Sequence, residues 1–150
     1  MAIDGKFKCQ MEDLFPHGAF VTSVVEPIRD FDRSTKEHPV QALDKETGMP
    51  MWEVTVQDGD PEAAKAMRSF QVKVAAKHQP VPPEAIPGTP FRPVFLEGIE
   101  VRPYVKENGA GRASIAYSVR AAGMRSAMPA GQSGSDSRRG KASGAAAEAA

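Results

Sequence analysis

Apolar and polar residues alternate along much of the first 123 residues, and this pattern predicts short β-strands. In residues 99–106, IEVRPYVK, the apolar residues fall on one face and Glu100, Arg102, Tyr104 and Lys106 fall on the other. The same period of two is clear in SFQVKVA at 69–75. The predicted strands are 18–26, 40–44, 51–57, 69–75, 91–97, 99–105 and 113–121.

Turn and helix signals complete the prediction of a mainly β domain. Gly48 suits a hairpin turn between 40–44 and 51–57, and Glu97-Gly98 reads as a tight turn. The best helix candidate is 60–68, two turns at most, with Asp60 as N-cap. We therefore expect a small closed or half-open barrel of the OB kind, with five to seven short strands and one short helix.

The composition changes after residue 123. Residues 124–150 are rich in Ala, Gly and Ser and contain no aromatic or β-branched residue, so we expect a disordered tail after a β-barrel domain at 1–123. The domain has 15 Lys and Arg against 17 Asp and Glu, a net charge of −2, and the tail has a net charge of +2. A basic surface on the domain thus requires that its charges segregate by face.

Residues suited to catalysis are sparse. The single cysteine, Cys9, allows no internal disulfide, and the three histidines lie in turn-like sequence without a nucleophile or zinc-ligand motif. Asp58, Asp60 and Glu62 could hold a divalent cation, although helix capping explains Asp60 more simply. The chain starts without a signal peptide and has no apolar run of membrane-spanning length. We therefore expect a cytoplasmic protein that is not an enzyme and needs no metal or cofactor.

The outer face of the strands offers a candidate nucleic-acid site. A barrel of the OB type binds single strands with a cationic groove and stacked aromatic rings. The residues expected to form such a path are Arg102, Tyr104, Arg120, Lys73, Arg112 and Arg92. The alternative is an ordinary polar sheet surface, with Glu97, Glu100 and Glu107 near enough to oppose phosphate.

Several blocks in one order resemble the Pra family, small proteins of actinomycete integrative and conjugative elements that are named as activators of plasmid replication, integration and excision. The blocks are FPHGA at 15–19, VEPIRDFDRSTK at 25–36, DKETGMPMW at 44–52, QPVPP at 79–83, VRPYV at 101–105 and AYSVRAAGM at 116–124. The resemblance covers about residues 6–125 and implies a regulatory role in the maintenance of a mobile element. It brings no catalytic or binding residues with it.

Two mechanisms follow from these observations. The chain either binds DNA directly on the outer strand face, or acts as an adaptor that binds a replication or recombination protein through its loops. A continuous stripe of the candidate cations favours DNA, whereas a stripe broken by glutamates favours the adaptor. The oligomeric state and the DNA target are open at this point.

Overall fold

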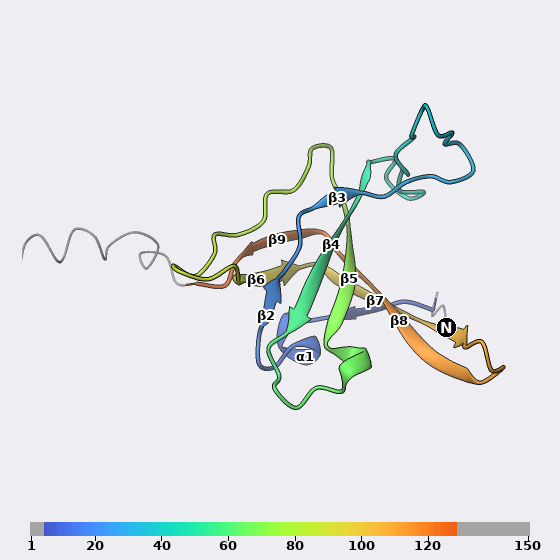
Figure 1. Cartoon of the computed structure of the whole chain (residues 1–150). Coiled ribbons are helices and arrows are strands. Elements are labelled where there is room, and N and C mark those ends of the chain that lie inside the picture. The colour runs from blue at the N-terminus through green and yellow to red at the C-terminus, as the bar shows by residue number, and fades with distance from the viewer. Residues whose placement is uncertain (1–4, 129–150) are drawn as a thin grey trace, which may run out of the picture.

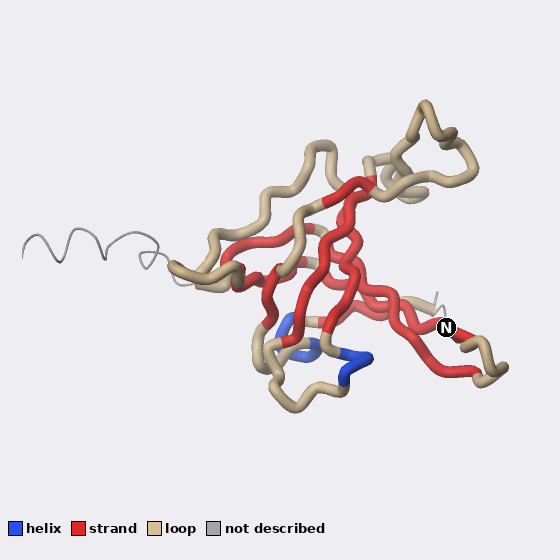
Figure 2. The backbone as a smooth tube through the Cα atoms, viewed as in Figure 1, coloured by secondary structure: helices blue, strands red, loops and turns tan. Residues whose placement is uncertain are grey.

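A computed structural model of the chain describes residues 5–128. Over these residues the protein is mainly β, as the alternating pattern predicts (Figures 1 and 2). A short helix α1 (Met11–Leu14) and a 3-10 turn (Lys65–Met67) accompany the strands. The nine strands are β1 (Phe7–Cys9), β2 (Ala19–Val21), β3 (Glu26–Pro27), β4 (Met51–Asp58), β5 (Ser69–Ala75), β6 (Arg92–Glu97), β7 (Ile99–Glu107), β8 (Ala113–Ala121) and β9 (Gly123–Ser126).

The strands form one curled sheet, a half-open barrel of the expected kind. Their order is β1-β7-β8-β5-β4-β2-β6-β9, and β3 pairs with β4 beside this path. Neighbouring strands are antiparallel except for β5 and β8, which run parallel. The strand number exceeds the five to seven expected, because β3 and β9 have four residues or fewer and give little alternation to detect.

β6–β7 and β8–β9 together make one long antiparallel ribbon that bends in the middle. Glu97 pairs with Gly123 and Glu100 pairs with Arg120, so the register is the same on both sides of the bend. At the bend Gly98 has φ +59°, and a Cβ there would lie 2.8 Å from the Cβ of Ala122. The expected tight turn at Glu97-Gly98 is thus a bend within a ribbon, and only glycine fits it easily.

The core lies inside the curl. β-Branched and leucine side chains from six strands fill it, and Phe15, which follows α1, packs edge-on against Phe70 with ring centroids 5.7 Å apart. Trp52 packs against this core as its position on the face of Val54 and Val56 predicts, and its Nε1 donates to the Ala76 carbonyl at 3.0 Å. The fully buried side chains are Val21, Val54, Val56, Val72, Val74, Val94, Leu96, Ile99 and Val119.

The predicted helix at 60–68 is wrong. Asp60 Oδ1 accepts a hydrogen bond from the backbone N–H of Glu62 at 2.9 Å, which makes a local turn, and Ala64 is extended (φ −57°, ψ 142°). The guanidinium of Arg68 then donates to the carbonyls of Ala63 and Pro61. Because these side chains satisfy the backbone locally, only the 3-10 turn remains of the helix.

Residues 40–44 form isolated bridges rather than a strand. Gln41 bridges Arg29 and Leu43 bridges Pro50, and Gly48 takes the positive φ (+71°) that the turn prediction requires. These bridges belong to a long excursion between β3 and β4, residues 28–50, that extends away from the barrel at the upper right of Figure 1.

The sheet continues past residue 123, where the sequence predicts the domain to end. β9 runs to Ser126 because Met124 packs against the core and the Arg125 guanidinium lies 4.0 Å from the centroid of the Phe95 ring. Residues 129–150 of the predicted tail lie outside the described residues. Neither of the short helices in residues 5–128 is long and apolar enough to cross a membrane.

Candidate nucleic-acid interface

Beyond the barrel, the strands β7 and β8 continue as a projecting ribbon, which we define as residues 102–118 (Figure 1). β1 pairs only with the first three residues of β7, and β5 pairs only with the last three residues of β8. The remaining strand residues, 102–107 and 113–118, therefore pair with each other alone. All six residues at 102–107 are exposed.

One face of the projecting ribbon carries the predicted cations and aromatic ring. Arg102, Tyr104 and Lys106 alternate along β7 and share this face. The residues directly opposite them on β8 are small: Ser118, Ala116 and Ser114. Because these opposite side chains are short, they do not cover the Tyr104 side chain, which is 48% exposed.

A cavity of about 700 Å³ lies where the projecting ribbon diverges from β5. Lys73 enters it from β5, while Arg102, Tyr104 and Lys106 enter it from β7. We call it the cationic groove. Among the described residues that line it there is no Asp or Glu, so its charged side chains are all positive. Glu53 lies opposite Lys73 on β4 but does not line the groove.

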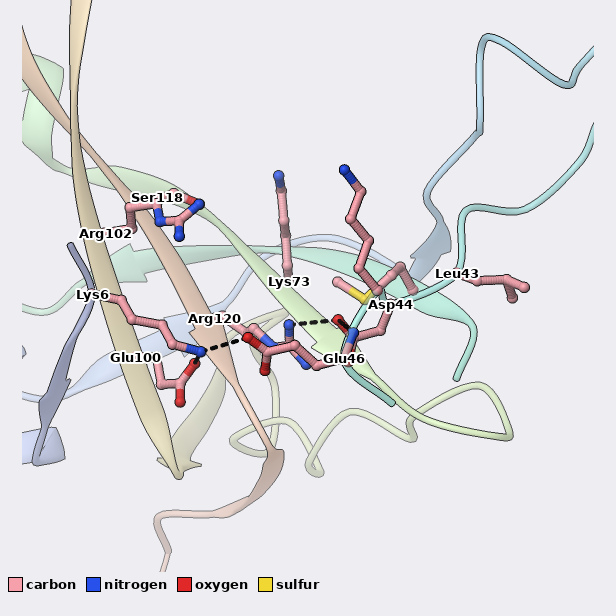
Figure 3. A pocket seen from close by; sticks show the side chains of 11 residues that line it. Lys6, Leu43, Asp44, Glu46, Lys73, Glu100, Arg102, Ser118 and Arg120 are labelled. Atoms are coloured by element: carbon pink, nitrogen blue, oxygen red, sulfur yellow. Dashed lines mark hydrogen bonds and ion pairs between the residues drawn. The ribbon is translucent and has the colours of Figure 1, made fainter. Parts of the chain in front are cut away.

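A second cavity, of about 460 Å³, adjoins the cationic groove and shares Lys73, Arg102 and Ser118 with it. Figure 3 shows Lys6 between Glu46 and Glu100, with Nζ–O distances of 2.7 and 3.5 Å. The Lys73 side chain extends away from these pairs. Among the cations that line the second cavity, Lys6 and Arg120 are thus paired with carboxylates, whereas Lys73 and Arg102, which it shares with the groove, form no ion pair within the described residues.

Arg120 and Asp44 form the tightest ion pair in this second cavity. The Arg120 guanidinium donates to both carboxylate oxygens of Asp44, at 2.8 and 2.6 Å. These two hydrogen bonds, with others from Thr47 and the Glu46 backbone, hold the pKa of Asp44 well below its usual range although burial opposes the shift. The same contact raises the pKa of Arg120. The pair ties the 28–50 excursion to β8.

The six predicted site residues therefore separate into groups. Lys73, Arg102 and Tyr104 lie together in the cationic groove, whereas Arg120 shares their sheet face but is neutralised by Asp44. Arg112 lies at the ribbon tip, where its backbone N–H donates to the Asn108 side chain.

Arg92 lies apart from the groove. It is on β6, on the side of the strand that carries Val94 and Leu96, and its guanidinium donates to the carbonyl of Pro83 at 2.6 Å. It thereby fixes to the barrel the connection between β5 and β6, residues 76–91, which contains five prolines and which we call the proline-rich connection. A stripe that runs unbroken through all the candidate arginines is not formed.

Lys106 joins the groove although it was not among the expected site residues. Its position on the face of Arg102 and Tyr104 follows from the period of two, so extending the count by two residues would have found it. The nearby glutamates are less of an obstacle than expected. Glu97 pairs with Arg125 at 3.1 Å, and Glu107 belongs to the opposite face of the ribbon.

Comparison of the chain with family models, with curated proteins and with solved structures finds no match. The resemblance to the Pra family thus stays an expectation from the sequence. What the groove can bind follows from its own geometry: anionic groups held by flexible cations, next to a flat ring with one open side.

Proposed function

We propose that this protein is a non-catalytic regulator that binds single-stranded DNA in the cationic groove. The observation that carries the proposal is the groove itself, in which three cations and an exposed tyrosine meet without a carboxylate in the described lining. Lys73, Arg102 and Lys106 contact phosphates, and Tyr104 stacks against a base.

The energies of such contacts are sufficient for useful affinity. Stacking of one base on Tyr104 contributes about 1–3 kcal/mol. If each of the three cations contacts one phosphate, the slope of log K against log salt is about −2 for a single strand. The net charge of the domain is −2, but the carboxylates of the adjoining cavity, Asp44, Glu46 and Glu100, are paired with Arg120 and Lys6.

The biological role that we propose is control of the replication, integration and excision of a mobile element in the cytoplasm. The support is the ordered set of sequence blocks that resemble the Pra family, two of which overlap the projecting ribbon: VRPYV at 101–105 and AYSVRAAGM at 116–124. These blocks include Arg102 and Tyr104.

The second candidate function is an adaptor that binds a replication or recombination protein without DNA. The observation that favours it is the 28–50 excursion, which extends from the barrel and carries Phe31 at 82% exposure. The break in the arginine stripe at Arg120 also favours it. The two candidates make opposite predictions for oligonucleotide binding.

Fluorescence anisotropy of a labelled single-stranded oligonucleotide and of its duplex tests the proposal, with the full chain as titrant at two salt concentrations. We expect salt-sensitive binding that favours the single strand. Tyr104→Ala should weaken it about 5- to 150-fold, the equivalent of the stacking energy, whereas Tyr104→Phe should retain most of the affinity because the ring remains.

Arg33→Ala is a charge-matched control, since Arg33 is exposed in the 28–50 excursion outside the groove lining. Equal losses in Arg33→Ala and Arg102→Ala would show a general charge effect and contradict the groove as the site. Absence of binding to either oligonucleotide at low salt would reject the DNA proposal and favour the adaptor.

A further inference from the structure

The face of the projecting ribbon opposite Arg102, Tyr104 and Lys106 is apolar. Val101 and Val119 form a directly opposed pair on this face and are buried in the barrel. The next two pairs outward, Pro103 with Tyr117 and Val105 with Ile115, continue the same face. Phe7 on β1, opposite Val101, borders it. We call Phe7, Pro103, Val105, Ile115 and Tyr117 the apolar face.

The apolar face reads as core in the sequence but is exposed in the structure. Val105 and Ile115 are 69% and 66% exposed, and Phe7 and Tyr117 are 50% and 46% exposed. No element within residues 5–128 covers these side chains. Contiguous apolar patches of several hundred Å² on a soluble protein mark an interaction surface.

The ribbon also lacks the support that such structures need. Two antiparallel strands alone are marginally stable in water, and a third strand or a second layer is required for independent stability. Residues 102–107 and 113–118 have no third strand beside them among the described residues. A second layer packed on the apolar face would supply what is missing.

We propose that the second layer is the same face of a second copy of this chain. A two-fold axis between the copies would stack the two ribbons face to face at the ~10 Å spacing of packed sheets. All five side chains of the apolar face are uncharged, and Glu107, which shares this side of the ribbon, lies beyond them at its outer end, opposite Ala113. Two identical copies can therefore meet through apolar side chains alone.

The area available is at the lower limit for a specific, weak dimer. With roughly 100 Å² exposed on each of the five side chains, two faces together would bury on the order of 1,000 Å², the lower limit of a specific interface. Ile115 and Tyr117 also border the cationic groove, so a dimer formed through the apolar face would cover one edge of each groove. This inference rests on the apolar face and not on the proposed function.

Sedimentation velocity of the full chain tests the proposal, over a concentration range from about 1 µM to about 300 µM, which brackets a micromolar Kd. We expect the sedimentation coefficient to rise from that of a monomer to that of a dimer. Ile115→Glu should keep the chain monomeric, because it places a carboxylate at the centre of the apolar face. Ser114→Glu is the matched control on the opposite face and should dimerise like the parent chain.

Unchanged Trp52 fluorescence in Ile115→Glu would confirm that the barrel is intact, as expected for a side chain outside the core. A chain that stays monomeric throughout the concentration range would overturn the proposal. So would a dimer that persists in Ile115→Glu.

Discussion

The long ribbon of β6–β7 and β8–β9 keeps one register from residue 92 to residue 126, yet its two halves lie in different surroundings. In the inner half, Leu96 and Ile99 are fully buried and β1, β2 and β5 flank the ribbon. In the outer half, Val105 and Ile115 have the same alternation but are largely exposed. The comparison shows that alternation fixes which face a residue is on, whereas neighbouring elements decide whether that face is buried.

The largest difference between the halves should appear in stability. Ile99→Ala should lower the free energy of unfolding by about 2–5 kcal/mol, because it leaves a cavity in the core. Ile115→Ala removes the same atoms from the outer half and should change the stability of the monomer by no more than about 0.5 kcal/mol. Urea unfolding followed by Trp52 fluorescence at submicromolar concentration measures both. Equal losses would mean that the outer half is packed as well as the inner half.

The Arg120–Asp44 ion pair beside the inner half of the ribbon should make the stability of the protein depend on pH. Asp44→Asn should destabilise the protein by about 3 kcal/mol at pH 7, because it removes one partner of a pair in which Asp44 is buried. Since the folded state lowers the pKa of Asp44, this stability is present above the ordinary carboxyl pKa and is lost as pH falls through the lower folded-state value. The difference between parent and variant should therefore shrink in acid, below about pH 4.

Glu46→Gln is the control for this second prediction. Glu46 pairs with Lys6 at 2.7 Å, but its side chain is 61% exposed and water screens the pair. Thermal unfolding of both variants and the parent chain, from pH 7 to below pH 4, measures the effect, and we expect a much smaller loss of stability than for Asp44→Asn. A pH-independent effect of Asp44→Asn would contradict the assignment to its carboxylate.

The bend and the tip of the ribbon each contain a glycine with positive φ, Gly98 and Gly111, and substitution of the two should have different effects. Gly98→Ala should cost about 2–3 kcal/mol, because it adds a Cβ at positive φ and against Ala122. Gly111 at the tip also has positive φ (+73°) but open space around it, so Gly111→Ala should cost only about 1 kcal/mol. Thermal unfolding of the two variants measures the difference. A smaller effect at Gly98 than at Gly111 would show that the bend adapts easily.

The strands of the barrel are the part of the fold that the sequence predicts best. β4, β5, β7 and β8 each have seven or more residues, so their period of two stands out. What local pattern does not contain is which strands pair. The parallel contact of β5 with β8 joins segments more than 40 residues apart, and it leaves the outer half of the ribbon without a neighbour. The exposure of Val105 and Ile115 follows from that contact.

The candidate site was predictable to a similar degree. Arg102, Tyr104 and Lys73 share a sheet face, which alternation and an assumed barrel suffice to indicate. The neutralisation of Arg120 was not predictable, because Asp44 is 76 residues away in the chain. The alternation assigns Arg92 to the core side of its strand. Its hydrogen bond to the Pro83 carbonyl depends on where the proline-rich connection crosses the barrel, which local pattern does not contain.

The smallest expected effect is a difference in the salt dependence of oligonucleotide binding between two variants, Arg102→Ala in the outer half of the ribbon and Arg92→Ala in the inner half. Arg102→Ala should reduce the slope of log K against log salt by about 0.7, the contribution of one phosphate contact on a single strand. Arg92→Ala should leave the slope unchanged, because its guanidinium is bound to the Pro83 carbonyl in the inner half.

Anisotropy titrations at four or more salt concentrations resolve a difference in slope of this size. The slope is more informative here than the affinity at a single salt concentration. Arg92→Ala can weaken binding through the barrel and its proline-rich connection, but only loss of a phosphate contact changes the number of counterions released. An equal reduction of the slope in both variants would place phosphates along the whole ribbon. That result would remove the functional distinction between its inner and outer halves.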